Sequence, residues 1–369
     1  MSSGETFSLL GASTEALQEG ASHAASYELP FVSIILPVRN EEPNITRTLQ
    51  CLRDQIYPRT RMEIIVVDGI STDDTRLIVS ATAALDSRVL LFDNPRHTMA
   101  AGFNLGLKAA KGEMIVMMGG HTELSPNYLH TCAALLQDGA ADCVGGPIQT
   151  VGETYVARAI SLAMSSRIGV GNSPFRIGCG KQKYVDTVAF GAYTRKIIER
   201  TGDRDEYFER GQDDEFNYRL RKLGGRILIV PQLQSRYASR SSLLSLWRQY
   251  FQYGYWKVRI LQKHPHQMQW RQFVPALFVS GLILLSIISA VLPRIGVPLL
   301  VGTLSTYTIV VGLASVLLTI RSFRLAPAVA VSFFVLHFSY GLGFLRGLIA
   351  FWHYWLPSKN GGTIATAGF

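Results

Sequence analysis

The chain has 369 residues, 48% of them hydrophobic, and a formal net charge of +9 at pH 7. The whole excess of positive charge lies in residues 241–369, which contain 10 Lys and Arg and no Asp or Glu. Because long apolar stretches interrupt this basic part, the composition indicates a membrane partner and excludes nucleic acid.

Residues 1–28 are rich in Ser, Ala and Glu and lack the basic start and apolar core of a signal peptide. We expect them to form a mobile N-terminal extension. Residues 29–240 are predicted to form one α/β domain, because apolar strands and amphipathic helices alternate through its first half, which is typical of a parallel, doubly wound sheet. The predicted strands are 32–37, 63–67, 88–92, 113–118 and 142–145, and the predicted helices are 43–55, 73–85, 98–110 and 126–137.

The second half of this domain has a weaker pattern. It contains a predicted helix at 153–166 and strand-like segments at Tyr184–Phe190 and Arg226–Val230. Between these two segments lies a predicted helix that begins at Asp213 and stops at Gly224 and Gly225.

Residues 241–271 are predicted to be an interfacial amphipathic segment. Within it, Ser242–Lys263 mixes Trp and Tyr with Arg and Lys, which suits the lipid headgroup layer. Residues 272–356 form a predicted transmembrane region, and 357–369 a tail. Three stretches there have the roughly 20 apolar residues that a bilayer core requires: Phe273–Leu292, Val297–Ile320 and Leu325–Leu345.

Basic residues indicate the orientation of these spans. They cluster before the first span, and Arg321 and Arg324 lie between the second and the third. The positive-inside rule therefore places the 29–240 domain in the cytoplasm, with the chain crossing the inner or plasma membrane several times. Three spans would put the C-terminus outside, although Arg346 and Lys359 follow the third span. This conflict leaves open a re-entrant third segment or a fourth short span through Gly347–Leu356.

Polar residues follow two neighbouring strands at the predicted carboxyl edge of the sheet. Arg39, Asn40 and Glu41 follow the first strand, and Asp68 and Ser71 follow the second. A carboxylate beside helix N-terminal donors at such an edge is where α/β sheets hold nucleotides.

These two segments, Pro-x-x-Asn-Glu and Asp-Gly-x-Ser-x-Asp in this chain, resemble the nucleotide-binding half of family 2 glycosyltransferases. The resemblance is closest to the succinoglycan-type β-glucosyltransferases of bacterial exopolysaccharide synthesis. It implies the GT-A fold, a Rossmann-like mixed α/β sheet, followed by C-terminal transmembrane helices. It also implies that a UDP-sugar donor contacts Pro37, Arg39, Asn40, Glu41, Asp68, Ser71, Asn104, Gly119 and Gly120.

The family normally has Asp-x-Asp at the end of the fourth strand, where it binds a divalent metal on the diphosphate. This chain has Gly119-Gly120-His121 there. The resemblance therefore implies a Mn²⁺ or Mg²⁺ cofactor with His121 as the candidate ligand, and a single imidazole suits Mn²⁺ better than Mg²⁺. In the alternative, Lys and Arg side chains neutralise the diphosphate directly.

The segment Glu209–Arg221 resembles the Glu-Asp-x-Glu segment of the family. In that register Asp213 is the catalytic base, at the start of a helix that would face the acceptor hydroxyl. Glu215 and Arg219 lie four residues apart on this helix and are predicted to form an ion pair.

Residues further along the chain are candidates for acceptor or diphosphate binding. The stretch Arg248–Lys257 stands where processive synthases carry Gln-x-x-Arg-Trp, but its spacing differs, which favours a single addition. The candidates are Asp214, Gln249, Tyr253, Trp256 and Lys257.

The resemblance implies an inverting glycosyltransferase that moves one sugar, glucose from UDP-glucose, to a polyprenyl-diphosphate-linked saccharide at the bilayer. Such a reaction belongs to extracellular polysaccharide or cell-envelope glycan synthesis. Two enzymatic alternatives stay open: transfer to polyprenyl phosphate itself, and processive synthesis. A third alternative is a non-catalytic scaffold that binds sugar nucleotides, because both metal-site aspartates are missing.

Overall fold

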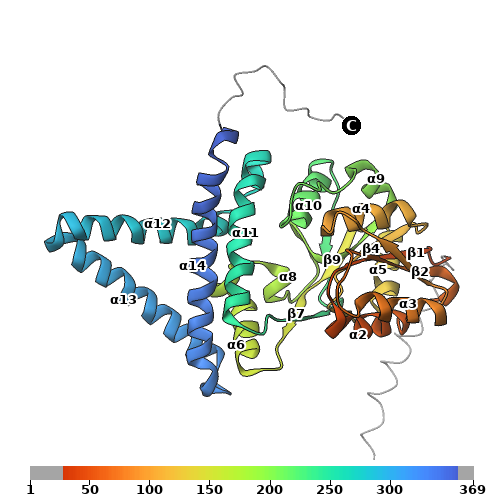
Figure 1. Ribbon diagram of the computed structural model, residues 1–369, viewed down its shortest axis with the longest axis horizontal. Helices are drawn as coiled ribbons and strands as arrows, with labels where there is room; N and C mark the ends of the chain where they lie inside the picture. Colours follow the sequence, from red (N-terminus) through yellow and green to blue (C-terminus); the bar gives the residue numbers. More distant parts are fainter. Residues whose placement is uncertain (1–27, 356–369) are drawn as a thin grey trace, which may run out of the picture.

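The structure is a computed structural model that describes residues 28–355. The predicted extension, apart from its last residue, and the predicted tail lie outside these described residues. An eight-stranded sheet forms the centre of the N-terminal part, in the order β3-β2-β1-β4-β9-β6-β10-β8 (Figure 1). Its strands are β1 (Val32–Val38), β2 (Met62–Asp68), β3 (Val89–Asp93), β4 (Met114–Met117), β6 (Cys143–Gly146), β8 (Lys183–Tyr184), β9 (Ala189–Thr194) and β10 (Ile227–Ile229).

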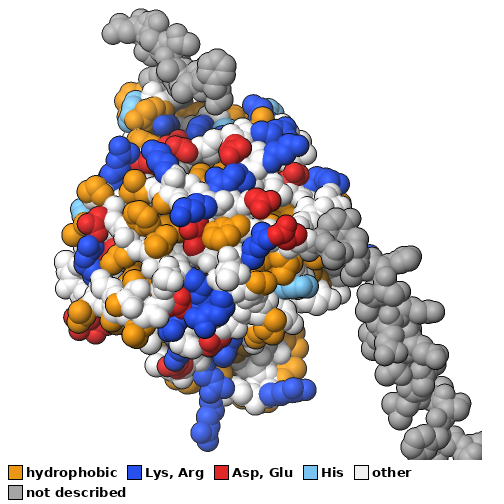
Figure 2. All heavy atoms as spheres, turned by 90° about the vertical axis from the view of Figure 1, so that its right-hand side faces the viewer, with side chains coloured by type: hydrophobic (Ala, Val, Ile, Leu, Met, Phe, Trp, Pro, Cys, Tyr) orange, Lys and Arg blue, Asp and Glu red, His pale blue; other side chains and the backbone are white. Residues whose placement is uncertain are grey.

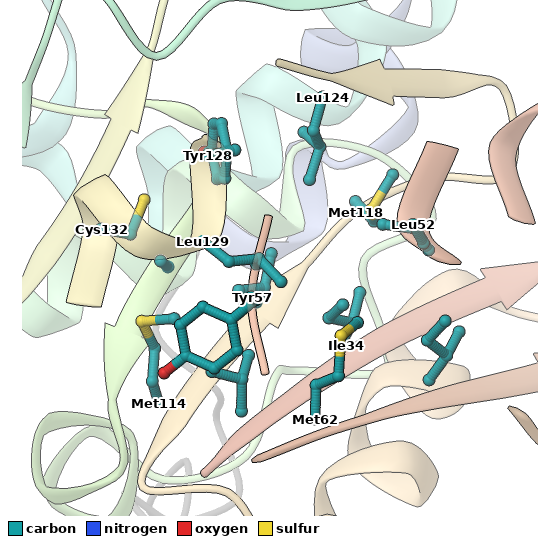
Figure 3. Close-up of a cluster of buried hydrophobic side chains, with 14 of the residues drawn as sticks. Ile34, Leu52, Tyr57, Met62, Met114, Met118, Leu124, Tyr128, Leu129 and Cys132 are labelled. Atoms are coloured by element: carbon teal, nitrogen blue, oxygen red, sulfur yellow. The ribbon is translucent and has the colours of Figure 1, made fainter. Parts of the chain in front are cut away.

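Helices cover both faces of the sheet. Every residue of β1 and β2 is buried, as expected for parallel strands between two helical layers. One face packs against α2 (Glu42–Arg53), α3 (Thr75–Leu85) and α5 (Tyr128–Gln137), in one cluster of buried side chains that includes Ile34, Leu52 and Leu129 (Figure 3). The other face packs against α4 (Met99–Ala109), α9 (Arg195–Thr201) and α10 (Gln212–Lys222). The predicted α/β domain is therefore a three-layer α/β/α structure.

The sheet is mixed, as the resemblance implies, and not parallel throughout as the strand–helix alternation predicts. β9 runs antiparallel to both of its neighbours, β4 and β6. The single strand predicted at 184–190 is wrong, because the chain forms the two-residue β8 and then β9, which continues to Thr194. β9 carries small residues at its centre, and a Cβ at Gly191 would lie 2.9 Å from the Cys143 Sγ. This close packing replaces the apolar alternation by which a strand is recognised in a sequence.

Helix boundaries differ from the prediction by one or two residues at several places, among them the start of α3 and both ends of α6 (Tyr155–Met164). The helix predicted at 126–137 begins at Tyr128, because Ser125–Asn127 form a turn in which the Tyr128 amide donates to the Ser125 carbonyl (2.9 Å). The helix predicted at 153–166 is shorter, spanning α6, and two four-residue helices follow it. These are α7 (Arg167–Val170) and α8 (Pro174–Ile177).

A second, three-stranded sheet was not predicted. Its order is β5-β11-β7, with β5 (Thr122–Leu124), β7 (Ile148–Val151) and β11 (Ser235–Ala238). Strands of three or four residues are too short to show a periodic pattern, and β11 pairs with residues more than 80 positions earlier in the chain. Short 3₁₀ turns complete the described part at Arg59–Arg61, Pro265–Gln267, Phe323–Leu325 and Trp352–Trp355.

Four long helices follow the domain: α11 (Leu243–Lys263), α12 (Trp270–Val291), α13 (Pro293–Leu318) and α14 (Ala326–Ala350). Among the described residues, three helices are long and apolar enough to cross a membrane, namely α12, α13 and the segment Phe323–Ala350 that contains α14. They coincide with the three predicted spans. α14 ends at Ala350 and a 3₁₀ turn follows, so the structure contradicts a fourth helical span from Gly347 onward.

α14 is placed differently from the other two apolar helices. In an 18-residue apolar stretch of this segment 50% of the residues are buried, compared with 17% in the corresponding stretches of α12 and α13. It lies parallel to α11, and the two backbones touch through glycines: a Cβ at Gly254 would lie 2.1 Å from the Tyr340 carbonyl oxygen, and one at Gly343 would lie 2.1 Å from that of Phe251. α12 runs crosswise to this pair and away from the domain (Figure 1). The opposite face of the molecule, in contrast, mixes acidic and basic side chains (Figure 2).

Candidate active site

The carboxyl ends of β1 and β2 meet at one edge of the sheet, with Val38 paired to Asp68. Backbone groups after β1 are held by side chains after β2. The Asn40 amide donates to the Ser71 Oγ (2.9 Å), and the Glu41 amide donates to the Thr75 Oγ1 (2.8 Å). The structure thus brings the two predicted nucleotide-binding segments together.

Asp68 lies beneath this edge and is fully buried. Its carboxylate accepts hydrogen bonds from the Ser71 hydroxyl (2.5 Å) and amide (3.1 Å), and Arg76 lies 3.5 Å away. Arg39 and Asn40 are exposed at the surface of the same edge. Of the predicted donor residues, these two are therefore the ones open to a nucleotide, whereas Asp68 and Ser71 hold the loop in shape.

Two other predicted donor residues lie inside the domain. Pro37 is buried in β1, and its ring packs against α4 where a Cβ at Gly102 would lie 2.8 Å from the Pro37 Cβ. Asn104 uses its whole amide to hold the loop after α9: its Nδ2 donates to the Arg204 carbonyl (2.9 Å) and its Oδ1 accepts from the Arg204 amide (2.9 Å). These contacts give both residues a structural role, and their contact with a donor stays a prediction.

His121 follows β4, close to the edge. Its Nδ1 lies 2.7 Å from the Glu41 Oε1, and its ring meets Tyr237 edge-on at 4.9 Å. Gly120 is packed closely, since a Cβ there would lie 2.9 Å from the Glu41 Cγ, whereas Gly119 has no such neighbour. Between residues 28 and 355 no group of three or more His, Cys, Asp or Glu side chains converges on a metal position. His121 and Glu41 therefore fit a divalent ion only together with oxygens of a bound diphosphate.

Asp213 stands at the start of α10. Gly211, just before this helix, has a φ of +79°, a left-handed conformation that suits glycine. The Asp213 side chain is 60% exposed and forms an ion pair with Arg204, whose side chain is only 2% exposed. Arg204 packs over the rings of Phe103 (4.4 Å) and Phe216 (5.0 Å). It also reaches the Met117 Sδ (3.0 Å) at the end of β4, so one buried guanidinium links the predicted base to the sheet edge.

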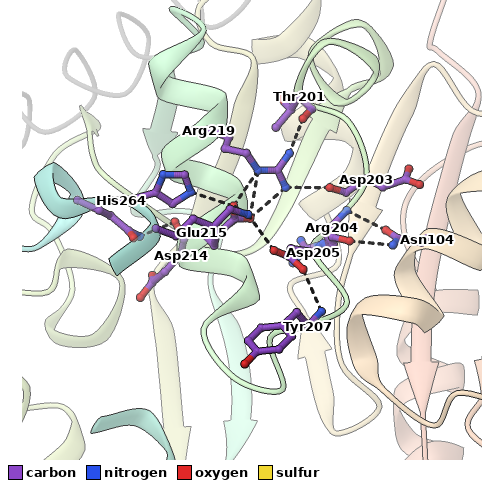
Figure 4. Close-up of polar contacts among 12 residues, drawn as sticks. Asn104, Thr201, Asp203, Arg204, Asp205, Tyr207, Asp214, Glu215, Arg219 and His264 are labelled. Carbon is purple, nitrogen blue, oxygen red and sulfur yellow. Dashed lines mark hydrogen bonds and ion pairs between the residues drawn. The ribbon is translucent and has the colours of Figure 1, made fainter. Parts of the chain in front are cut away.

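Glu215, two residues after Asp213, is fully buried and holds several cations (Figure 4). The predicted Glu215–Arg219 ion pair is confirmed at 3.0 Å. In addition Lys263 lies 2.8 Å from the carboxylate, and the His264 Nε2 lies 3.0 Å away. Burial raises the pKa of Glu215, but hydrogen bonds from His264, Arg219 and Lys263 outweigh it and lower the pKa to about 2. The network fastens α10 to α11.

The predicted acceptor residues lie on α10 and α11. Lys257 pairs with Asp214 (2.8 Å), and the Gln249 Nε2 donates to the Tyr253 hydroxyl (2.9 Å). Trp256 packs instead between aromatic rings of the domain and of the α14 end, 5.8 Å from Tyr207 and 5.9 Å from Phe351. The interfacial prediction for α11 therefore needs one correction: Lys257 and Lys263 face carboxylates of the domain and not lipid phosphates.

Two arginines at this site were missed in the sequence. One is Arg204, and the other is Arg176 in the four-residue α8. The Arg176 Nη1 is buried and has no hydrogen-bond partner among the described residues. Its guanidinium lies 5.4 Å from the centre of the Phe175 ring. Neither arginine belongs to a sequence motif. The contacts that position Arg204 on the sheet, with Phe103 and Met117, are made by residues far upstream in the chain.

A mixed α/β sheet with polar residues after β1 and β2, and an exposed carboxylate tied by Arg204 to the end of β4, agrees with the GT-A fold. Residues 33–202 match the family model "Glycosyl transferase family 2". The chain therefore contains a family 2 glycosyltransferase domain and is an enzyme of this kind.

Relatives extend the likeness over most of the chain. The chain is 29% identical over 330 residues to the succinoglycan biosynthesis protein ExoA of Rhizobium meliloti, covering 86% of this chain and 95% of the relative. It is 28% identical to a dolichyl N-acetyl-alpha-D-glucosaminyl phosphate 3-beta-D-2,3-diacetamido-2,3-dideoxy-beta-D-glucuronosyltransferase of Methanococcus voltae, covering 86% and 97%.

A solved structure shares the fold. It is a mannosyltransferase of Pyrobaculum calidifontis in complex with GDP-mannose and Mn²⁺, with a TM-score of 0.56 and 18% identity, covering 91% of this chain and 95% of that one.

Proposed function

We propose that this enzyme transfers one sugar, glucose, from UDP-glucose to a saccharide on a polyprenyl diphosphate, with inversion at the anomeric carbon. The observation that carries the proposal is the position of Asp213, which is exposed at the start of α10 and tied by the buried Arg204 to the end of β4. In the reaction, the acceptor oxygen bonds to the anomeric carbon as the bond from that carbon to the UDP oxygen breaks. The hydroxyl proton passes to the Asp213 carboxylate, and UDP leaves as the anion.

The relatives support the class of acceptor. The Methanococcus relative is named for transfer to a dolichyl-linked phosphate sugar, and the Rhizobium relative for succinoglycan biosynthesis. Each alignment covers 86% of this chain. The single addition and the choice of glucose rest on the resemblance in the sequence.

The test is UDP release by the purified chain in detergent, with UDP-glucose and a polyprenyl-diphosphate-linked saccharide. Acceptor-dependent release of UDP with one sugar added per acceptor supports the proposal. A polymer product would favour processive synthesis, and faster transfer to polyprenyl phosphate would favour that acceptor. UDP binding without turnover for any sugar nucleotide would favour the scaffold alternative.

We propose that His121, together with oxygens of the donor diphosphate, would hold a divalent ion beside the UDP leaving group. A bound ion would supply positive charge to the leaving group. We expect EDTA to abolish transfer and Mn²⁺ to restore it. We also expect His121→Ala to raise the Mn²⁺ concentration at half-maximal rate by at least about tenfold, since even an outer-shell partner of a metal ligand contributes that much.

A calorimetric titration of UDP with and without Mn²⁺ gives a second readout of the ion. His121→Ala should reduce the gain in UDP affinity that Mn²⁺ produces and leave the affinity in EDTA within about twofold. Transfer that survives EDTA would contradict the ion and assign charge neutralisation to Arg and Lys.

We further propose that α12 and α13 form a transmembrane hairpin, and that α14 lies along the membrane surface. α14 packs along α11, and α11 is fixed to the domain through the ion pairs Lys257–Asp214 and Lys263–Glu215. A crossing α14 would therefore draw these charged pairs into the bilayer, at a cost of several kcal/mol for each ion. α12, with 22 residues, is long enough at about 33 Å. This arrangement keeps Arg346 on the side of the domain, which removes the charge conflict seen in the sequence.

Cysteine labelling in sealed membrane vesicles tests this topology. Single cysteines replace Arg294 in the first turn of α13, His353 after α14, and, as a marker of the domain, the exposed Lys196. We expect a membrane-impermeant maleimide to label positions 353 and 196 from the same side, and position 294 from the other. Labelling of 353 and 196 from opposite sides would show that α14 crosses the membrane.

A further inference from the structure

A groove of about 750 Å³ lies apart from the active site, at the junction of the domain with the apolar helices. One wall comes from the three-stranded sheet and α6, and the other from the end of α13 and the loop that joins it to α14. None of its lining residues belongs to the donor edge, to α10 or to α11. The groove therefore has no part in the reaction proposed above.

The lining has more positive than negative charge. Four arginines (Arg47, Arg158, Arg236 and Arg321) and two glutamates line the groove. Glu123 lies 3.7 Å from Arg47 and 4.0 Å from Arg236, and Glu153 lies 4.0 Å from Arg47. Among the residues that the structure describes, Arg158 and Arg321 have no carboxylate within 4.0 Å, and both are exposed. Two cations of the groove are thus available to an anion.

The remaining lining is suited to a lipid. The exposed Ser322 adds a hydroxyl group, and Leu162 and Leu318 add apolar surface. Leu318 is the last residue of α13, so this apolar surface continues onto a helix that is long and apolar enough to cross a membrane. Cations and a hydroxyl group beside apolar surface match a phosphodiester headgroup and the first carbons of its acyl chains.

We propose that this groove binds the headgroup of an anionic phospholipid of the bilayer, with Arg158 and Arg321 on the phosphate. Bound lipid would bridge α6 of the domain to the α13–α14 loop and hold the domain in one orientation relative to the membrane. A soluble phosphate offers the same charge but cannot use the leucines, which is why the lipid is the favoured occupant.

Arg321 and Arg324 provide a matched pair for the test, since both are exposed arginines of one loop and only Arg321 lines the groove. The purified full chain in detergent is titrated with a short-chain phosphatidylglycerol, and binding is followed by native mass spectrometry. We expect R321Q to weaken binding about fivefold and R158Q/R321Q about 25-fold, because each arginine near an anionic lipid contributes about a factor of five. R324Q should stay within about twofold of the parent chain.

Three results would overturn the proposal: equal losses in R321Q and R324Q, no loss in R158Q/R321Q, or inorganic phosphate binding as tightly as the lipid. A zwitterionic phosphatidylcholine of the same chain length keeps the phosphate and the acyl chains but adds a choline cation that cancels the net negative charge. We expect it to bind more weakly than phosphatidylglycerol. All these measurements are of binding, so they stand whether or not the chain transfers sugar to the proposed acceptor. The substituted side chains are exposed, and a thermal melt of each variant checks its folding.

Discussion

Replacing Asp213 by Asn is expected to lower kcat for sugar transfer by about 10³-fold, within the range that a general base contributes. The substitution keeps the size of the side chain and removes its ability to take the acceptor proton. Arg204 stays in place, because its ring contacts with Phe103 and Phe216 and its contact with Met117 do not depend on Asp213. UDP affinity, measured by calorimetry, should therefore stay within about twofold.

Asp214→Asn is the matched control, one position further along the same helix. Asp214 pairs with Lys257 and is only partly exposed, so its loss leaves one lysine without its partner and the base in place. We expect a fall in rate of at most about tenfold. If Asp213→Asn kept more than about a tenth of the parent rate, or if Asp214→Asn had the larger effect, the assignment of the base to Asp213 would be wrong.

Replacing Glu215 by Gln is expected to lower the free energy of unfolding by about 3–5 kcal/mol, the usual cost of removing one partner from a buried ion pair. The carboxylate is fully buried and lies within 3.0 Å of Arg219, Lys263 and His264 (Figure 4). The neutral amide leaves Arg219 without its carboxylate and Lys263 with Asp205 as its remaining partner (2.8 Å). Chemical denaturation in detergent at neutral pH measures the difference, and Glu199→Gln on α9, an exposed carboxylate, is the control.

The same carboxylate makes stability depend on pH. The pKa of Glu215 is about 2 in the folded chain, below its ordinary value of 4.5. The folded state therefore binds the Glu215 proton less readily than the unfolded state does, and the stabilisation is fully present above about pH 4.5 and is lost as the pH falls towards 2. We expect the parent chain to lose stability over this window and Glu215→Gln to lose less. Parallel stability curves for the two chains would show that Glu215 does not carry the effect.

The features that could be predicted from the sequence depend on residues close together in the chain. Each of these features shows in a short stretch of sequence. They are the buried strand β1 with the polar residues after it, the buried strand β2 with the polar residues after it, and the pair Glu215–Arg219. The glycine and carboxylates that begin α10 likewise place Asp213 at a helix start.

The features that were missed depend on contacts between distant residues. Arg204 is positioned by Asn104, 100 residues earlier, and no local pattern distinguishes it from the other arginines of the domain. β9 is recognised only by its packing between β4 and β6. Lys257 and Lys263 have the spacing that an interfacial helix would show, and only their carboxylate partners on α10 reveal which way they face.

The seam between α11 and α14 also bears on how this enzyme can change over evolution. The helix that begins with the predicted base is bound to α11, and α11 touches α14 backbone to backbone at Gly254 and Gly343. Any larger residue at these glycines would separate the two helices and, through the Lys263–Glu215 pair, displace the start of α10. The catalytic domain and its membrane-facing helices are therefore not interchangeable modules. A recombination that replaced the chain after residue 240 would remove the α11 partner of Glu215, so we expect the domain and these helices to be inherited together.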